Sequence, residues 1–271
     1  MPDQTYGPYE VLNPHEAWRM VVLVVGMSLA GYVAVKIFGR TRGVVLAGLL
    51  GGVISSTATT ASAARMTLAS ANAGDGTDAD HARRDLDNVA ATIVMLATLV
   101  MYTRVLVEIA VVAPTHFARL APPIGALALV TLALSVLLWL RARRAETALP
   151  EPDNPAALRP AIVFGLLYAG VLFIAAAAQD HLGSAGLYAV AAISGLTDMD
   201  AITLGSARLA NDGGVPPGEA WRAIVIAAGA NMVFKTILVG ALGTRRMLRR
   251  VALMYAICTA AGVAIVIIWP G

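Results

Sequence analysis

The chain has 271 residues, 58% of them hydrophobic and only 14% charged, with a formal net charge of +3. Soluble domains of this length are far less apolar, so the composition excludes an ordinary soluble protein. Cys258 is the single cysteine, which excludes an intramolecular disulfide and a cysteine metal cluster. Anionic lipid headgroups explain the arginines beside the apolar runs better than nucleic acid does, so no nucleic-acid partner is expected.

Six apolar runs are each long enough to cross a bilayer as a helix, which takes about 18 residues or more. In chain order they are 18–38, 89–113, 120–140, 158–178, 220–243 and 250–269. Two further runs, 44–70 and 187–210, have the length but are interrupted by polar residues. The residues before the first run contain acids and no base, unlike a secretory signal. The sequence therefore predicts an all-α, polytopic membrane protein with one integral membrane domain over 1–271.

The two interrupted runs resemble each other. Gly43 to Arg65 (GVVLAGLLGGVISSTATTASAAR) and Gly186 to Arg208 (GLYAVAAISGLTDMDAITLGSAR) align without a gap. The shared residues are Gly43/Gly186, Gly52/Gly195, Ala58/Ala201, Thr60/Thr203, Ala64/Ala207 and Arg65/Arg208. This similarity predicts two internal repeats, 17–140 and 158–269, joined by a polar linker over 141–157 that we expect to be cytoplasmic. Residues 71–88 are also polar and predict a second linker.

The basic residues near the ends of the runs distinguish two membrane arrangements. If all eight runs cross, these residues divide ten against eight between the two sides. If 44–70 and 187–210 instead enter and return on one side, they divide fourteen against four. The positive-inside rule favours the second arrangement. We therefore expect six spans plus two re-entrant or broken polar helices, with the repeats inverted as in many transporters, and eight full spans as the alternative.

Paired polar interruptions in the two halves of a membrane protein are typical of a transport site. A carboxylate at membrane depth needs a cation, a basic partner or a proton, and mixed carboxylate and hydroxyl oxygens suit a hard cation such as Mg²⁺. The predicted ion-binding residues are Ser55, Ser56, Thr57, Thr197, Asp198 and Asp200, with the two aspartates as hypothetical metal ligands. The alternative is that the aspartates only cap the second half-helix. Backbone carbonyls freed by the break are expected to join the site, and Gly51, Gly52 and Gly195 to provide the break.

Two cations lie in the middle of corresponding apolar spans. Arg104 and Lys235 are predicted to balance the charge of the aspartates or to gate the site, since both are too deep for easy snorkelling. Asn231 precedes Lys235 by one helical turn and is expected either to reach the site or to bond a neighbouring helix. Glu108 follows Arg104 by one turn, and the spacing predicts a local salt bridge between them.

Two segments, GYVAVKIFGRTRGVVLAGLLGGVISSTATTASAAR and SGLTDMDAITLGSARLA, resemble the bacterial membrane domain of unknown function 4010. The opening PDQTYGPYEVLNPHEAWRMVVLV also resembles the first span of that domain, which is often fused behind an MgtC/SapB-type membrane domain. The resemblance implies a multi-pass protein of the bacterial inner membrane and, by analogy, a link to magnesium homeostasis or membrane energetics. It also implies a chain that acts alone or beside a separate MgtC-like partner, and it leaves the roles of the signature residues open.

The sequence contains no Walker-type motif, no GxSxG elbow and no dinucleotide fingerprint, so we expect neither an enzyme nor a cofactor. The leading hypothesis is a small-ion transporter or channel, for a divalent or proton-coupled cation such as Mg²⁺. One alternative is an anion transporter that uses Arg104 and Lys235. Another is a non-transporting membrane subunit or regulator that partners an MgtC-like protein. The expected partners are the lipid bilayer and a small ion, and a homo-oligomer is compatible with the sequence.

Overall fold

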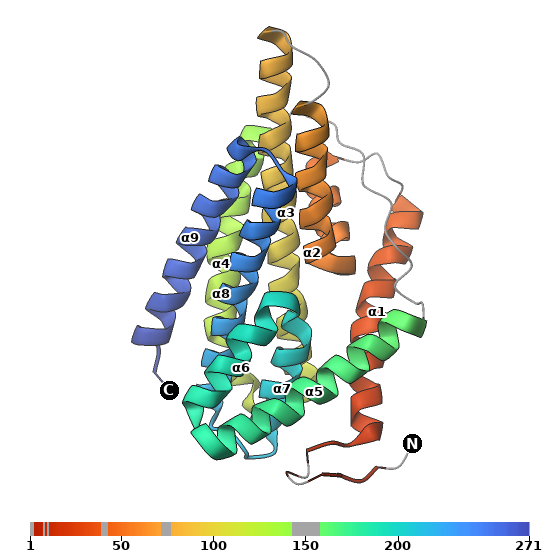
Figure 1. The fold of residues 1–271 in the computed structure, drawn as a ribbon, viewed down its shortest axis with the longest axis vertical. Coiled ribbons are helices and arrows are strands. Elements are labelled where there is room, and N and C mark those ends of the chain that lie inside the picture. The colour runs from red at the N-terminus through yellow and green to blue at the C-terminus, as the bar shows by residue number, and fades with distance from the viewer. Residues whose placement is uncertain are drawn as a thin grey trace.

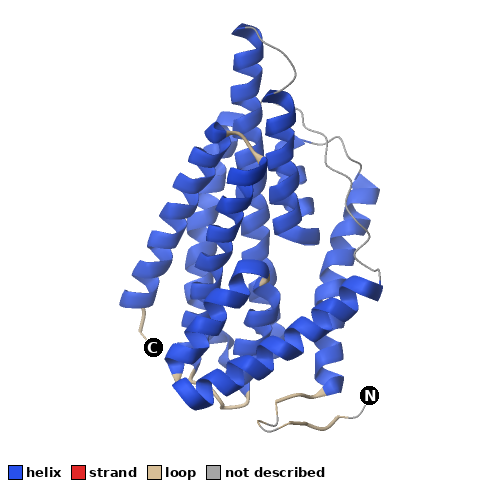
Figure 2. Ribbon diagram, viewed as in Figure 1, coloured by secondary structure: helices blue, strands red, loops and turns tan. Residues whose placement is uncertain are grey.

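The computed structural model describes residues 3–7, 9, 11–38, 43–71, 77–142 and 158–270. These residues are almost entirely helical, and no strand forms among them (Figure 2). Seven of the described helices are long and apolar enough to cross a membrane. The prediction of an all-α, polytopic helical protein is therefore confirmed.

Helices pack side by side along most of the molecule's length (Figure 1). In chain order they are α1 (Pro14–Phe38), α2 (Gly43–Ala71), α3 (Thr77–Val112), the short 3₁₀ helix η1 (Pro114–His116), α4 (Phe117–Ala142), α5 (Leu158–Leu182), α6 (Ser184–Thr197), α7 (Met199–Asn211), α8 (Pro217–Leu242) and α9 (Arg245–Ile268). Each of the six uninterrupted apolar runs lies mainly within one of these helices. α3 and α8 form the centre of the bundle, since each contacts both α2 and α7.

The sequence predicts a linker over 71–88, but most of this polar segment is helical. From Thr77 onward it is the first part of α3, which extends beyond the other helices at the upper end of Figure 1. Residues 77–88 include four aspartates, and negative charge near a helix N-terminus is favourable, so the polarity of this segment is compatible with the start of a helix. The other predicted linker, 141–157, lies outside the described residues beyond the end of α4 at Ala142.

α2 is broken in its middle at Ser55, where φ is −165° and ψ is 113°. A β carbon placed on Gly51 would lie 2.6 Å from Oγ1 of Thr59. Residues eight apart in a continuous helix are separated by about 12 Å along its axis, so the chain must fold back. Both ends of α2 accordingly lie toward the upper end of Figure 1. Although α2 counts as a membrane span by length, its shape is a helical hairpin.

α6 and α7 form a second hairpin, and the break between them is Asp198, with φ −146° and ψ 124°. Asp198 is the residue that aligns with Ser55 in the gapless comparison of the two runs. The halves have 14 and 13 residues, so each is about 20 Å long and too short to cross a hydrocarbon core of about 30 Å. Their outer ends lie toward the lower end of Figure 1. The two hairpins therefore enter from opposite ends, while the inverted repeat and the number of membrane crossings stay predictions.

The predicted glycines lie where backbones approach closely. A β carbon on Gly52 would lie 2.7 Å from Cα of Ala97 on α3, and one on Gly195 would lie 2.5 Å from Cα of Ala227 on α8. Gly51 packs instead against the second half of its own hairpin. Gly52 and Gly195 therefore allow each hairpin to pack against the long helix of its own half of the chain. The prediction that the glycines provide the breaks is wrong, since all three are helical and the helices break three or more residues later, at Ser55 and Asp198.

Gly195→Ala is expected to lower the free energy of unfolding by roughly 1–3 kcal/mol, because the new methyl group meets backbone atoms that cannot rotate away. The measurement is thermal unfolding of the detergent-purified protein. Gly229→Ala on α8 is the matched control, since a β carbon there meets nothing within 4 Å. Alanine in that open helical position is expected to be neutral or slightly stabilising. Equal effects of the two substitutions would contradict the close packing at Gly195.

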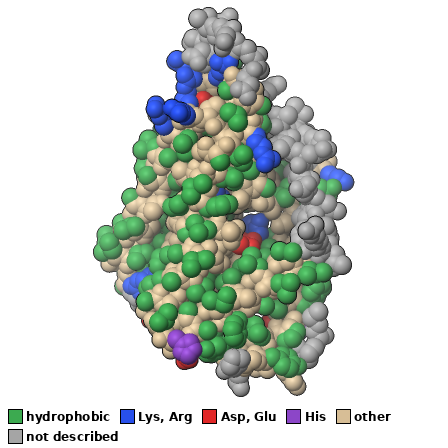
Figure 3. All heavy atoms as spheres, in the orientation of Figure 1, with side chains coloured by type: hydrophobic (Ala, Val, Ile, Leu, Met, Phe, Trp, Pro, Cys, Tyr) green, Lys and Arg blue, Asp and Glu red, His purple; other side chains and the backbone are tan. Residues whose placement is uncertain are grey.

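Charge is concentrated away from the middle of the bundle. Figure 3 shows Lys and Arg side chains gathered near the upper end of one face, above a broad hydrophobic zone. The first turns of α3 carry Arg83 and Arg84, and α9 begins with Arg245 and Arg246. Both helices start at this upper end (Figure 1). The arrangement agrees with the charge distribution that favoured two re-entrant segments.

Candidate functional site

A cavity of about 230 Å³ lies where the two hairpin breaks meet. Its lining residues are Val24, Ser28, Gly52, Ile54, Ser55, Ser56, Thr57, Met101, Arg104, Phe164, Thr197, Asp198, Met199, Asp200 and Asn231. All six predicted ion-binding residues are on this wall, together with Gly52, Arg104 and Asn231, whereas Gly51, Gly195 and Lys235 are not. Figure 3 shows acidic and basic side chains in a hollow at the middle of an otherwise largely apolar face.

The two breaks are capped in the same way. Asp198 Oδ1 accepts hydrogen bonds from the amides of Asp200 (2.7 Å) and Ala201 (3.3 Å), and Ser55 Oγ accepts one from the amide of Ala58 (3.2 Å). Ala58 and Ala201 are themselves aligned in the repeat. Each break therefore satisfies amides that the new half-helix would otherwise leave unpaired, and the negative charge of Asp198 is favourable at that position. Asp198 both caps α7 and lines the cavity.

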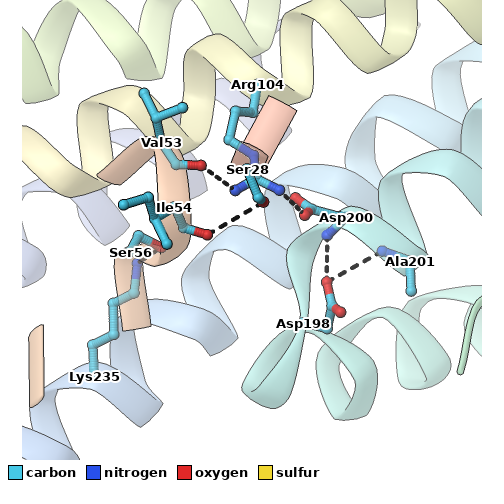
Figure 4. A network of polar contacts seen from close by, with 9 residues as sticks. All are labelled: Ser28, Val53, Ile54, Ser56, Arg104, Asp198, Asp200, Ala201 and Lys235. Carbon is cyan, nitrogen blue, oxygen red and sulfur yellow. Dashed lines mark hydrogen bonds and ion pairs between the residues drawn. The ribbon is translucent and has the colours of Figure 1, made fainter. Parts of the chain in front are cut away.

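Arg104 joins the two hairpins (Figure 4). Its Nη1 donates a hydrogen bond to the Val53 carbonyl at the first break (3.1 Å), and its Nη2 forms an ion pair with Asp200 beyond the second. The side chains of Arg104 and Asp200 are only 11% and 15% exposed. The structure thus provides the expected counter-ion contact. The predicted local salt bridge to Glu108 is wrong, because the guanidinium group points across to α2 and α7.

Lys235 is fully buried behind the cavity wall. Its Nζ donates to Ser56 Oγ at 2.9 Å and contacts Met101 Sδ at 3.5 Å. Among the described residues no carboxylate lies within 4.0 Å of this ammonium group, so it does not form the expected direct contact with an aspartate. Its charge still acts on Asp200 at longer range. Lys235 therefore contributes a positive field at the first break.

The backbone carbonyls beside the breaks are already hydrogen-bonded, contrary to the expectation that they would be free to bind an ion. Ser28 Oγ donates to the Ile54 carbonyl (3.3 Å), and Asn231 Nδ2 donates to the Gly195 carbonyl (2.9 Å). The Val53 carbonyl accepts from Arg104. The oxygen atoms left for a ligand are therefore mainly the hydroxyl groups and the carboxylate of Asp198. Asn231 on α8 has both of its predicted alternative roles, since it lines the cavity and also bonds the neighbouring helix α6 near its end.

Sequence reasoning missed the contributions of α1 and α5 to the wall. Ser28 is a small polar residue within the apolar run 18–38, and this was the only feature of the sequence that could have indicated a role in the site. Phe164 gave no signal, because an aromatic residue is ordinary in a membrane span. Glu108 was assigned a local partner, yet it is fully buried and both its carboxylate oxygens lack a hydrogen-bond partner among the described residues.

A bundle of apolar helices that encloses two broken polar hairpins defines a polytopic helical membrane protein with a buried polar site. The family model described as Domain of unknown function (DUF4010) matches residues 22–243, and the chain belongs to this family. The chain is similar to an uncharacterized protein of Aquifex aeolicus (strain VF5), with 27% identity over 198 residues that cover 72% of this chain and 80% of that protein. No solved structure matches the chain. The family membership implied by the two motifs is confirmed.

Proposed function

We propose that this chain moves a small ion across the membrane through a site between the tips of its two hairpins. One observation carries the proposal: Ser55 and Asp198, at aligned positions, break two helices that enter from opposite ends and face one polar cavity. In a membrane, non-helical backbone is tolerated where it is buried in protein or lines a cavity. Opposed broken helices are typical of transporters that bind their substrate near the middle of the membrane.

The first candidate substrate is a cation. Arg104 neutralises Asp200, so the charge of Asp198 is the one left to act on a ligand. The hydroxyl groups of Ser55, Ser56, Thr57 and Thr197 line the same cavity. Carboxylate and hydroxyl oxygens suit a hard cation, with Mg²⁺ as the first choice and proton coupling as a second property to test.

An anion is the second candidate, and Lys235 is the observation that favours it. This ammonium group is buried beside Ser56 with no carboxylate within 4.0 Å among the described residues. The helical segment 56–71 and α7 also both begin at the breaks, so their positive ends face the cavity. Two helix N-termini and Arg104 would hold a small oxyanion in the cavity, and Lys235 would add its positive charge from behind Ser56.

The proposal includes a bacterial inner-membrane location and leaves room for the MgtC-like partner that the family resemblance implies. It requires neither an enzymatic activity nor a cofactor. A non-transporting regulator is the remaining interpretation. It predicts no ion binding by the purified chain together with stable co-purification of a membrane partner.

Thermal unfolding in detergent tests the proposal. Magnesium, calcium, manganese and sodium chloride are compared with sodium phosphate and sulfate, for the wild type and Asp198→Asn. A ligand at a hundred times its Kd stabilises the folded state by about 2.7 kcal/mol. We expect stabilisation by one cation that is lost in Asp198→Asn. Asparagine also caps helices well, so the fold should be retained.

Asp85→Asn, at an exposed position in the first turns of α3, is the control for removal of one negative charge. It should keep the full cation effect. Stabilisation by an anion alone would replace the first candidate with the second. A lack of any stabilisation would favour the regulator.

A further inference from the structure

Asn231 on α8 has a buried amide group beside the second hairpin break. The residue is only 2% exposed, and it belongs to the wall of the cavity between the two breaks. Its Nδ2 donates a hydrogen bond to the Gly195 carbonyl at 2.9 Å, whereas its Oδ1 has no hydrogen-bond partner among the described residues. The nitrogen of this amide therefore holds the end of α6, and the oxygen is not used by the fold.

The contact with α6 fixes which atom of the amide faces the hairpin. A backbone carbonyl accepts hydrogen bonds and cannot donate one, so the nitrogen of Asn231 has to face Gly195. Close packing preserves this arrangement, because a β carbon on Gly195 would lie 2.5 Å from Cα of Ala227, one helical turn before Asn231. The amide oxygen consequently faces away from the Gly195 carbonyl.

This oxygen requires a positive or hydrogen-donating partner. A buried amide oxygen without one is unfavourable, and such atoms are uncommon in folded proteins. The two buried cations at the cavity are directed to other groups, since Arg104 pairs with Asp200 and Lys235 donates to Ser56. A cation in the cavity would supply the partner that the oxygen of Asn231 lacks.

An amide oxygen also adds a ligand type that the site otherwise lacks. The backbone carbonyls of Val53, Ile54 and Gly195 already accept hydrogen bonds. Asn231 therefore offers a carbonyl oxygen where the backbone does not, beside the carboxylate of Asp198 and the hydroxyl groups on the same wall. Amide, carboxylate and hydroxyl oxygens are all hard ligands, which bind cations such as Mg²⁺, Ca²⁺ and Na⁺.

We propose that Oδ1 of Asn231 is a direct ligand of the cation, and that its lack of charge sets the preference of the site between divalent and monovalent ions. This inference rests on the proposed cation site. Because Arg104 neutralises Asp200, Asp198 supplies the negative charge that acts on the ion, and Asn231 attracts it through its dipole alone. A carboxylate at position 231 would add a second negative charge. Electrostatic attraction is proportional to the charge of the ion, so that change favours a divalent ion over a monovalent one.

Titrations of thermal stability with magnesium, calcium and sodium chloride, on the detergent-purified protein, are the first test. Asn231→Leu removes the whole amide at similar volume and should weaken binding of the preferred cation at least about tenfold. Asn231→Asp keeps an oxygen but loses the donor to Gly195, and it should raise the ratio of magnesium affinity to sodium affinity at least about tenfold. A residue that only held the end of α6 would weaken both ions by the same factor in both variants.

Asn231→Cys tests direct contact with the ion. Thiolates prefer soft metals, so this variant should bind cadmium at least about tenfold more tightly than the wild type in the same assay with cadmium chloride. Gly229→Cys is the matched control, because it adds a thiol to the same helix outside the cavity wall, where a β carbon meets nothing within 4 Å. It should leave the cadmium affinity unchanged. Cys258 is present in all three proteins, so its contribution cancels.

The outcomes separate this inference from the proposed function. Cation stabilisation that keeps its wild-type affinity in Asn231→Leu would overturn the ligand role and leave the ion site intact. An unchanged ratio of affinities in Asn231→Asp, without a gain in cadmium affinity in Asn231→Cys, would overturn it as well, and these two variants decide if Asn231→Leu does not fold. Absence of cation stabilisation in the wild type would overturn the proposed cation site itself, and this inference with it.

Discussion

Arg104→Met is expected to lower the free energy of unfolding by about 3–5 kcal/mol, since it leaves the buried carboxylate of Asp200 without its partner. The substitution also removes the hydrogen bond to the Val53 carbonyl, so both hairpin tips lose their connection to α3. Ion-dependent stabilisation should disappear as well, because the geometry of the cavity depends on these tips. Thermal or denaturant unfolding of the purified protein, with and without added ions, measures both effects.

A double-mutant cycle separates the ion pair from general damage. Asp200→Asn removes the negative charge that Arg104→Met leaves unpaired. The double variant Arg104→Met/Asp200→Asn should therefore be more stable than Arg104→Met alone. Arg208→Met is the control for loss of an arginine from a more exposed pair. Arg208 contacts Glu16 and Asp212 with 22% of its side chain exposed, and its loss should cost at most about 1 kcal/mol. Additive effects of the two substitutions at Arg104 and Asp200 would contradict a coupled pair.

The hairpin breaks were predictable because two of the long apolar runs contain clusters of polar residues, which are unusual within a continuous membrane helix. Backbone groups in lipid must be paired within the helix, so clusters of polar residues and glycine in an apolar run mark places where the helix can end. The alignment without gaps placed Ser55 opposite Asp198, and the structure breaks at these two residues. The count of basic residues also predicted that each hairpin enters the membrane and returns to the same side. The position of the hairpin ends in Figure 1 agrees with this prediction.

The partners of the buried charges could not be predicted in the same way. Spacing along one helix suggested that Arg104 contacts Glu108, but a long side chain at a helix interface can also reach a neighbouring helix. Asp200 is 96 positions away in sequence, and the Ser56 partner of Lys235 is 179 positions away. Such pairs depend on how hairpins dock on α3 and α8, and local periodicity contains no information on that docking. For the same reason Glu108 gave no sign that it would lack a partner.

Lys235→Met is expected to leave stability nearly unchanged and to raise the affinity for a cation at least about tenfold. Stability should be kept because no carboxylate within 4.0 Å, among the described residues, loses a partner when the ammonium group is removed. Methionine also fits beside Met101. An ion that contacts Ser56 Oγ would lie roughly 5 Å from Nζ, where two like unit charges repel by about 3 kcal/mol at an effective dielectric constant of 20.

The sign of this effect distinguishes the two candidate substrates. Lys235→Arg keeps the positive charge, so its ion affinities should stay close to those of the wild type, and Lys36→Met tests loss of an exposed cation at the end of α1. Titration of thermal stability with magnesium chloride and with sodium phosphate gives both affinities for each variant. If Lys235→Met instead loses stabilisation by phosphate and gains none with cations, the substrate is an anion. A buried ammonium group favours a ligand of opposite charge, so its removal cannot weaken the binding of a cation by electrostatics alone.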